Sequence, residues 1–159
     1  MPDWFVVNVA DADAYQHKTA GTYVPFERGE ERFPEFGINI HVLEPGEPNG
    51  KYHYESAQED FLVLSGECLA IIEGEEHHLH AWDFFHCPAG TAHIFVGAGE
   101  GPCAILMVGA RQADERVHYA VNELAARYGA STPEATDDSR IAYSDWDNEL
   151  KSTRLEWSP

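Results

Sequence analysis

Apolar and polar residues alternate in short runs through the middle of the chain, and turn residues separate the runs. The runs cover residues 37–43, 60–64, 68–72, 77–80, 84–87, 92–96 and 103–108. An alternation with a period of two is typical of strands, because successive side chains point to opposite faces of a sheet. Short strands at this even spacing predict an all-β fold, an antiparallel sandwich or barrel over residues 36–110.

The first part of the chain, residues 1–35, has a weaker pattern. It contains one β-prone run, Trp4 to Val9, followed by a mixed stretch with glycine breaks. We expect an N-terminal strand and an arm here. The strand could add to the edge of a sheet or to a partner.

The last part, residues 111–159, changes to a helical pattern before it becomes polar. Apolar residues recur at helical spacing around Asn122, a plausible helix cap: Val121, Leu124, Ala125 and Tyr128. Thr132-Pro133-Glu134 predicts a second helix start, since proline is favoured at the first helical position. We expect a helical and irregular tail whose final stretch, from Ser144, packs loosely or frays.

The amino-acid composition limits the kinds of molecule that the protein is expected to bind. The 159 residues include 10 Lys and Arg against 28 Asp and Glu, a formal net charge of -18. This charge repels nucleic acid and anionic membranes, so we expect neither as a partner. No signal peptide or apolar run long enough for a membrane helix is visible, which predicts a cytoplasmic protein. Cys68, Cys87 and Cys103 lack CxxC spacing and are expected to be free buried thiols.

Candidate chemistry is concentrated in two segments beside predicted strands. His53 and Glu55 are two residues apart, so both can point to the same face of a strand. Glu59 begins the next strand, and His93 begins another just after a Pro-x-Gly turn. In a rolled-up sheet these segments can be neighbours. Imidazole nitrogens and carboxylate oxygens would then converge as ligands of a divalent metal at the mouth of a barrel.

The first of these segments resembles the first motif of the cupin superfamily, roughly G-x5-H-x-H-x3-4-E-x6-G. Gly46 precedes His53 with one extra residue. Glu55 stands in the slot of the second histidine, Glu59 follows after three residues, and Gly66 follows after six more.

The second segment resembles the second cupin motif, roughly G-x5-P-x-G-x2-H-x3-N. Pro88, Gly90 and His93 match it, whereas Trp82 stands in the slot of the first glycine and Gly97 in that of the asparagine. Both motifs match in one chain, with strand-like sequence between them. The resemblance therefore implies an antiparallel double-stranded β-helix, the jelly-roll barrel of cupins, over residues 36–110.

The resemblance also implies a metal cofactor, and Glu55 is the departure that bears on it most. If Glu55 is a ligand, the set His53, Glu55, Glu59 and His93 has two imidazoles and two carboxylates. This set favours Mn²⁺ or Fe²⁺ over Cu²⁺, with Zn²⁺ or Ni²⁺ also open. If Glu55 lies off the metal, the other three form a two-histidine-one-carboxylate site, and Glu55 is placed to act as a general base.

The function implied by the resemblance is binding of a small polar organic molecule whose oxygen completes the metal shell. Dioxygenase, isomerase and lyase chemistry all fit a metal-dependent enzyme. The alternative is a non-catalytic small-ligand-binding or sensor protein, because a fold does not determine a function. Phe61, Phe95 and His41 are the expected pocket residues. A homodimer is expected because cupins commonly pair through sheet edges.

Overall fold

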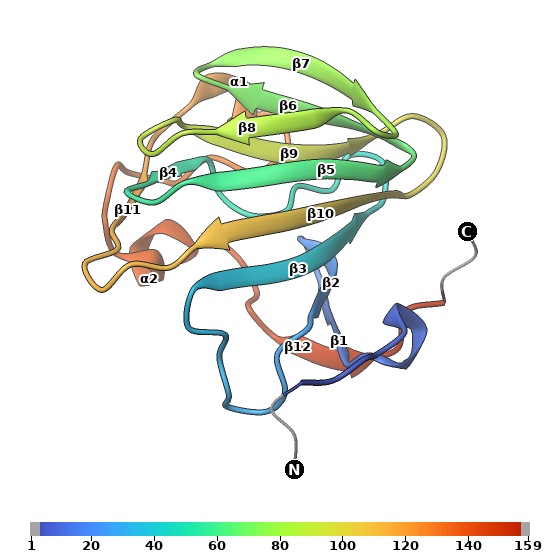
Figure 1. Cartoon of the computed structure of the whole chain (residues 1–159). Coiled ribbons are helices and arrows are strands. Elements are labelled where there is room, and N and C mark those ends of the chain that lie inside the picture. Colours follow the sequence, from blue (N-terminus) through green and yellow to red (C-terminus); the bar gives the residue numbers. More distant parts are fainter. Residues whose placement is uncertain (1–3, 157–159) are drawn as a thin grey trace.

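Two antiparallel sheets form the fold, seen here in a computed structural model that describes residues 4–156 (Figure 1). The larger sheet has the strand order β12-β1-β2-β3-β10-β5-β8, and the smaller has the order β11-β4-β9-β6-β7. The strands are β1 (Ala14–His17), β2 (Gly21–Pro25), β3 (Phe36–Leu43), β4 (His53–Glu55), β5 (Glu59–Ser65), β6 (Glu67–Ile72), β7 (Glu75–His80), β8 (Phe84–Cys87), β9 (His93–Ala98), β10 (Cys103–Ala110), β11 (Val117–Tyr119) and β12 (Leu150–Thr153). The all-β fold predicted from the alternating pattern is therefore confirmed, and the two sheets agree with the jelly roll that the resemblance implies.

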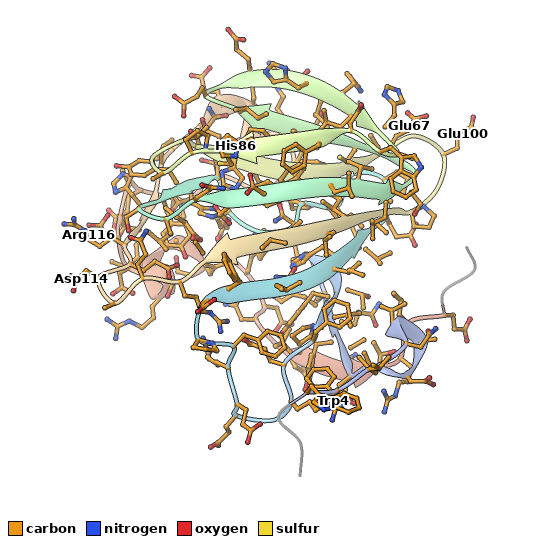
Figure 2. All side chains as sticks on the ribbon, in the orientation of Figure 1. Trp4, Glu67, His86, Glu100, Asp114 and Arg116 are labelled. Carbon is orange, nitrogen blue, oxygen red and sulfur yellow. The ribbon has the colours of Figure 1, made fainter. Side chains whose placement is uncertain are left out.

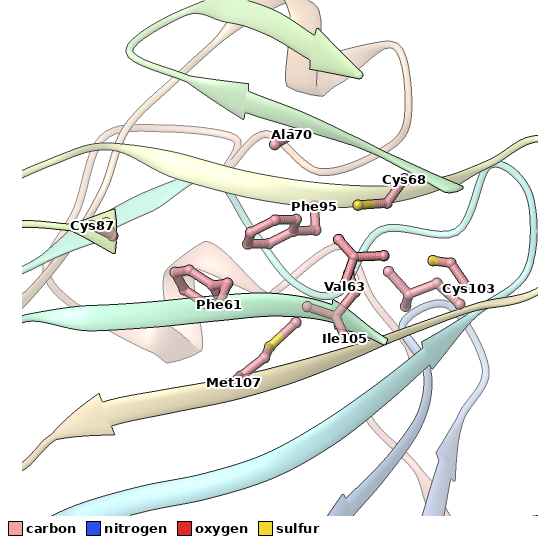
Figure 3. Packing of buried hydrophobic residues seen from close by; sticks show 10 residues of the cluster. Phe61, Val63, Cys68, Ala70, Cys87, Phe95, Cys103, Ile105 and Met107 are labelled. Carbon is pink, nitrogen blue, oxygen red and sulfur yellow. The ribbon is translucent and has the colours of Figure 1, made fainter. Parts of the chain in front are cut away.

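The main core lies between the two sheets. Phe61 and Val63 on β5 share a face, and they meet Phe95 on β9 and Ile105 on β10 (Figure 3). All four are at most 3% exposed. The period of two along each strand thus places one set of side chains inside, where burial of apolar surface stabilises the sandwich.

A second core lies on the outer face of the smaller sheet. Leu69, Ile71, Ile94 and Val96 are buried there against the segment around α1 (Glu123–Ala126). Asn122 caps this single-turn helix, since its side-chain oxygen accepts the Ala125 N–H at 2.9 Å. The helix start predicted at Asn122 is confirmed, and the segment protects one face of the smaller sheet.

The second helix start predicted at Thr132-Pro133-Glu134 is wrong. The Thr132 hydroxyl donates to the Glu134 carbonyl at 2.8 Å, and this local hydrogen bond holds a turn instead. The next helix, α2 (Ser139–Ala142), begins after Asp138, whose side chain accepts the Arg140 N–H.

The strand predicted at Trp4 to Val9 is also wrong. Residues 4–8 belong to no strand, and a short 3-10 helix, η1 (Val9–Asp11), follows. The N-terminal strands are β1 and β2 instead. β1 has β12 on one side and β2 on the other, so neither of its edges is free to pair with the preceding segment.

The C-terminal tail is paired into a sheet where loose packing or fraying was expected. β12 pairs with β1, so that Ala14 lies opposite Thr153, and the two strands lie side by side below the barrel in Figure 1. Residues 1–3 and 157–159 lie outside the described part of the chain. Within that part, no helix is long and apolar enough to cross a membrane.

The three cysteines behave as expected. Cys68, Cys87 and Cys103 are free and buried in the main core. They fill space there as small apolar side chains.

Candidate metal centre

Strand pairing brings the two motif histidines together. β4 and β9 pair with His53 opposite His93, and the two ring centroids are 5.0 Å apart. Glu59 reaches the same point from β5, in the other sheet, with its Oε2 3.3 Å from His93 Nε2. The ligand atoms of His53, Glu59 and His93 all lie within 4.8 Å of one another, so these residues could hold a metal ion. The site joins both sheets.

Backbone carbonyls orient both imidazoles. His53 Nδ1 is 2.7 Å from the Lys51 carbonyl oxygen, and His93 Nδ1 is 3.0 Å from that of Thr91. With a proton on Nδ1, each ring donates to its carbonyl and leaves the Nε2 lone pair free. This is the tautomer that metal coordination through Nε2 requires.

The charges around the site suit a cation. Burial, aided by the nearby carboxylate of Glu55, raises the pKa of Glu59 to about 7. Burial, with a smaller contribution from His53, lowers the pKa of His93 to about 4, which keeps this imidazole neutral. A neutral imidazole at His93 and a carboxyl group at Glu59 that can give up its proton are donors that a divalent ion needs. The residues present therefore fit a metal ion.

Glu55 lies beside the three residues and on the same side of β4 as His53. Its Oε1 is 3.4 Å from His53 Nε2. Burial acts to raise the pKa of Glu55, but the His53 hydrogen bond and charge outweigh it, so the pKa is lowered. At His53, burial acts to lower the pKa. The hydrogen bond with Glu55, the charge of Glu59 and the Lys51 carbonyl outweigh this effect, so the pKa of His53 is raised. Glu55 is thus an ionised carboxylate next to the three convergent ligand atoms.

A cavity of about 540 Å³ opens over this site. Glu55 and Glu59 line it together with Asn39 and Arg111. The loop after β10 forms part of its rim. In Figure 2, Asp114 and Arg116 of that region lie at the end of the barrel opposite Glu67 and Glu100. A small polar molecule entering at this end would meet the carboxylates directly.

The three expected pocket residues are not brought together. Phe61 and Phe95 are buried, with ring centroids 4.7 Å apart, and Phe61 packs against the His93 ring at 5.1 Å. They support the histidine from within the core. His41, in contrast, lines a separate cavity bounded by the ends of the chain.

Two further residues near the site were not found from the sequence. Lys51 is fully buried, with its Nζ 2.8 Å from Asp145 and within 3.1 Å of the carbonyl oxygens of Gly129 and Ser131. Nothing in the local pattern marks a lysine at this position for burial, because all its partners lie far along the chain.

The second is Tyr119, whose ring centroid lies 5.8 Å from that of His53. Burial, aided by Tyr143, raises the pKa of its hydroxyl to about 12. Tyr119 lies opposite His53 in the β4–β11 pair, so only knowledge of that pairing could have revealed it.

Comparisons with known proteins agree with this geometry. A family model described as a cupin domain matches residues 39–109. A sugar phosphate isomerase from a cupin superfamily, from Silicibacter pomeroyi, is 23% identical, with a TM-score of 0.56 over 95% of this chain and 82% of that chain. The polyketide cyclase RemF from Streptomyces resistomycificus is 18% identical, with a TM-score of 0.59 over 71% of this chain and 84% of that chain.

A structure of a Streptomyces PAC13 variant with uridine is 15% identical, with a TM-score of 0.56 over 74% of this chain and 91% of that chain. No curated protein matches the chain. At these identities the solved structures establish a shared fold and nothing finer. Together with the family match and the observed sheets, they support a small cupin domain over residues 39–109.

Proposed function

We propose that this protein is a metal-dependent cupin that acts on a small polar organic molecule. The convergence of the His53, Glu59 and His93 ligand atoms within 4.8 Å supports the proposal. The three come from different strands, and the two imidazoles are oriented by backbone carbonyls. A site whose ligands are already oriented favours binding, because the side chains lose little conformational freedom when the ion binds.

The ligand chemistry narrows the cofactor to a divalent ion. Two imidazoles and one carboxylate suit Fe²⁺ and Mn²⁺, and they also accept Zn²⁺ or Ni²⁺. Three protein ligands leave coordination positions open for a molecule that enters through the cavity lined by Glu55 and Glu59, the mouth cavity. The bound ion would supply a Lewis acid that polarises an oxygen of that molecule.

Glu55 is the proposed proton-transfer residue. Its ionised carboxylate lies at the site and also lines the mouth cavity, so it can accept a proton from a bound molecule. Proton transfer beside a polarised oxygen is the basis of isomerase and lyase chemistry. The names of the structural neighbours, one a sugar phosphate isomerase, are compatible with this class, although the shared fold alone does not determine it.

Mn²⁺ titrations of three proteins test these roles. Glu59→Gln should weaken Mn²⁺ binding by about tenfold or more, because it removes a charged ligand. Glu55→Gln should keep the wild-type affinity within a few-fold. It should also abolish solvent deuterium incorporation into any hydroxy or keto compound that the wild type exchanges. Equal weakening by both variants would make Glu55 a ligand and overturn its role as the proton-transfer residue.

A second candidate function is non-catalytic binding of a small molecule. The observation that favours it is the separate cavity at His41, which contains none of the three convergent residues. An organic ligand recovered unchanged from metal-loaded protein, with no proton exchange in any compound tested, would favour this function over catalysis.

A further inference from the structure

A second cavity, of about 450 Å³, lies between the β1–β3 end of the larger sheet and the segment that leads into β12. Most of its lining belongs to residues outside 39–109, the part that matches the cupin domain. The cavity is therefore formed mainly by the segments that precede and follow the matched region. Its volume suits a ligand of one or two rings.

Aromatic rings form two sides of this cavity. On one side the Trp146 ring lies 5.4 Å from His17 and 5.3 Å from Tyr143, measured between centroids. On the other, Tyr23 and His41 stack with centroids 5.7 Å apart and planes inclined by 22°. Faces of this kind favour a planar ring, which can stack or meet them edge to face.

Two polar atoms in the cavity wall have no partner. Asn39 Oδ1 and His41 Nδ1 are buried and make no hydrogen bond within the described part of the chain. Buried polar atoms are nearly always satisfied in native proteins. Asn39 Oδ1 can only accept, so the missing partner must carry an N–H or O–H group.

Charge is missing from the cavity wall. The described residues that line it include no lysine, arginine, aspartate or glutamate. Burial also lowers the pKa of His41 to about 4, so this ring is neutral at physiological pH. An ionic ligand would lose its hydration without gaining a counter-charge. The mouth of the metal centre differs in this respect, since three glutamates and two arginines line it.

We propose that this cavity binds a neutral aromatic or heteroaromatic ring that carries a hydroxyl or N–H group on its edge. The ring lies between the Trp146 and Tyr23 sides, and its edge group donates to Asn39 Oδ1. The site stands apart from the proposed metal function, because none of its lining residues is one of the convergent ligands. Asn39 lines both cavities, so the edge of the ring lies toward the metal centre.

Calorimetry on the full, metal-free chain tests this site with four probes. Phenol should bind. Anisole, which lacks the donor, should bind about tenfold more weakly, the loss expected for one hydrogen bond. Cyclohexanol lacks the planar ring and should also bind more weakly. Benzoate carries a charge and should not bind measurably.

Two variants and a control locate the binding. Asn39→Leu should remove the preference for phenol over anisole, and Tyr23→Leu should weaken both ligands equally. Trp82→Leu is the control, because Trp82 is 74% exposed and does not line the cavity. Equal affinity for phenol and anisole in the wild type, an unchanged preference in Asn39→Leu, or no phenol binding would each overturn the proposal. Because the protein is metal-free, failure of Mn²⁺ binding does not affect the result.

Discussion

The metal centre and the aromatic cavity occupy the same sandwich but differ in almost every physical respect. The candidate metal centre gathers ionisable groups from β4, β5 and β9, all within the cupin domain. The aromatic cavity is neutral and is formed mostly by the two ends of the chain. Central strands are held on both sides by ladder pairing, so they can position charged groups accurately. The segments on either side of the cupin domain can form an additional cavity of different shape that is lined by uncharged residues.

Lys51 connects these two regions. Its carbonyl oxygen orients His53, and its backbone N–H donates to the Tyr143 hydroxyl at 3.1 Å. Its buried ammonium group also pairs with Asp145 and lies 4.8 Å from the centroid of the Trp146 ring. One residue therefore contacts both a histidine of the candidate metal centre and the aromatic side of the second cavity.

The largest effect is expected when the metal centre alone is broken. His93→Ala should lower Mn²⁺ affinity by about 100-fold or more, since it removes a ligand oriented by the Thr91 carbonyl. Phenol binding should not change. Metal analysis after dialysis measures the loss. His86→Ala is the control, because His86 is an exposed histidine paired with Asp60 outside the site. Wild-type metal content in His93→Ala would contradict the assignment.

Lys51→Met should affect the connection between the two regions. It leaves the Ser131 carbonyl without this donor, leaves the Gly129 carbonyl with only the Trp146 indole N–H, and removes the ion pair with Asp145. We expect the free energy of unfolding to fall by about 3 kcal/mol. Phenol affinity should fall more than Mn²⁺ affinity. Urea unfolding provides the measurement. The matched control Lys18→Met removes an exposed pair with Asp147 and should cost less than about 0.5 kcal/mol. Equal losses in the two variants would show that Lys51 has no special role.

The metal centre should also respond to pH. Glu59 has a pKa of about 7 in the metal-free fold and must lose its proton to bind an ion. Mn²⁺ affinity should therefore rise about tenfold per pH unit up to about pH 7 and then level off. The raised pKa of His53 acts in the same direction. Glu59→Gln should bind more weakly with a shallower slope, and an unchanged slope would contradict the role of Glu59.

In the metal-free protein the Glu59 carboxyl group has the opposite pH dependence, because a rise in pH lowers its contribution to the free energy of unfolding. Because its folded pKa lies above the ordinary value of 4.5, the folded state holds more protons than the unfolded state between pH 4.5 and 7. The contribution of Glu59 to stability is full below this window and is lost as the pH rises through it. His93, with its lowered pKa, acts oppositely, so the comparison of wild type with Glu59→Gln isolates the effect.

The smallest effect is expected at a position that belongs to neither region. Trp82 is exposed and has a φ of 74°, a conformation that favours glycine. Trp82→Gly should raise the free energy of unfolding by about 1 kcal/mol. Trp82→Ala keeps a Cβ atom and should not. Thermal unfolding distinguishes them, and a gain in both variants would point to the indole and not to the backbone.

The strands of the sandwich and the positions of the candidate metal-site residues could be predicted because both depend on short-range spacing. Alternation located β3, β5, β6, β8, β9 and β10 within about two residues of their observed bounds. The His-x-Glu spacing placed His53 and Glu55 on one face, as observed. The direct role of Glu55, the homodimer and the cytoplasmic location stay predictions.

The chain ends could not be predicted in the same way. β1 and β12 are four residues each, and only their mutual pairing makes them strands. Lys51 meets Asp145 across most of the chain, so no local periodicity reports the contact. Pro133 has the residue preference of a helix start, but a side-chain hydrogen bond of Thr132 outweighs it.

The pairing of β1 with β12 has a consequence for synthesis. A ribosome makes the chain from its N-terminus. Ala14 therefore cannot pair with Thr153, and this edge of the sheet cannot be completed, until the C-terminal strand has been synthesised. The cupin strands can assemble earlier, since their pairings close as soon as β10 has emerged. The nascent protein therefore acquires its candidate metal centre before its aromatic cavity, and its outermost strand forms only after Thr153 has emerged.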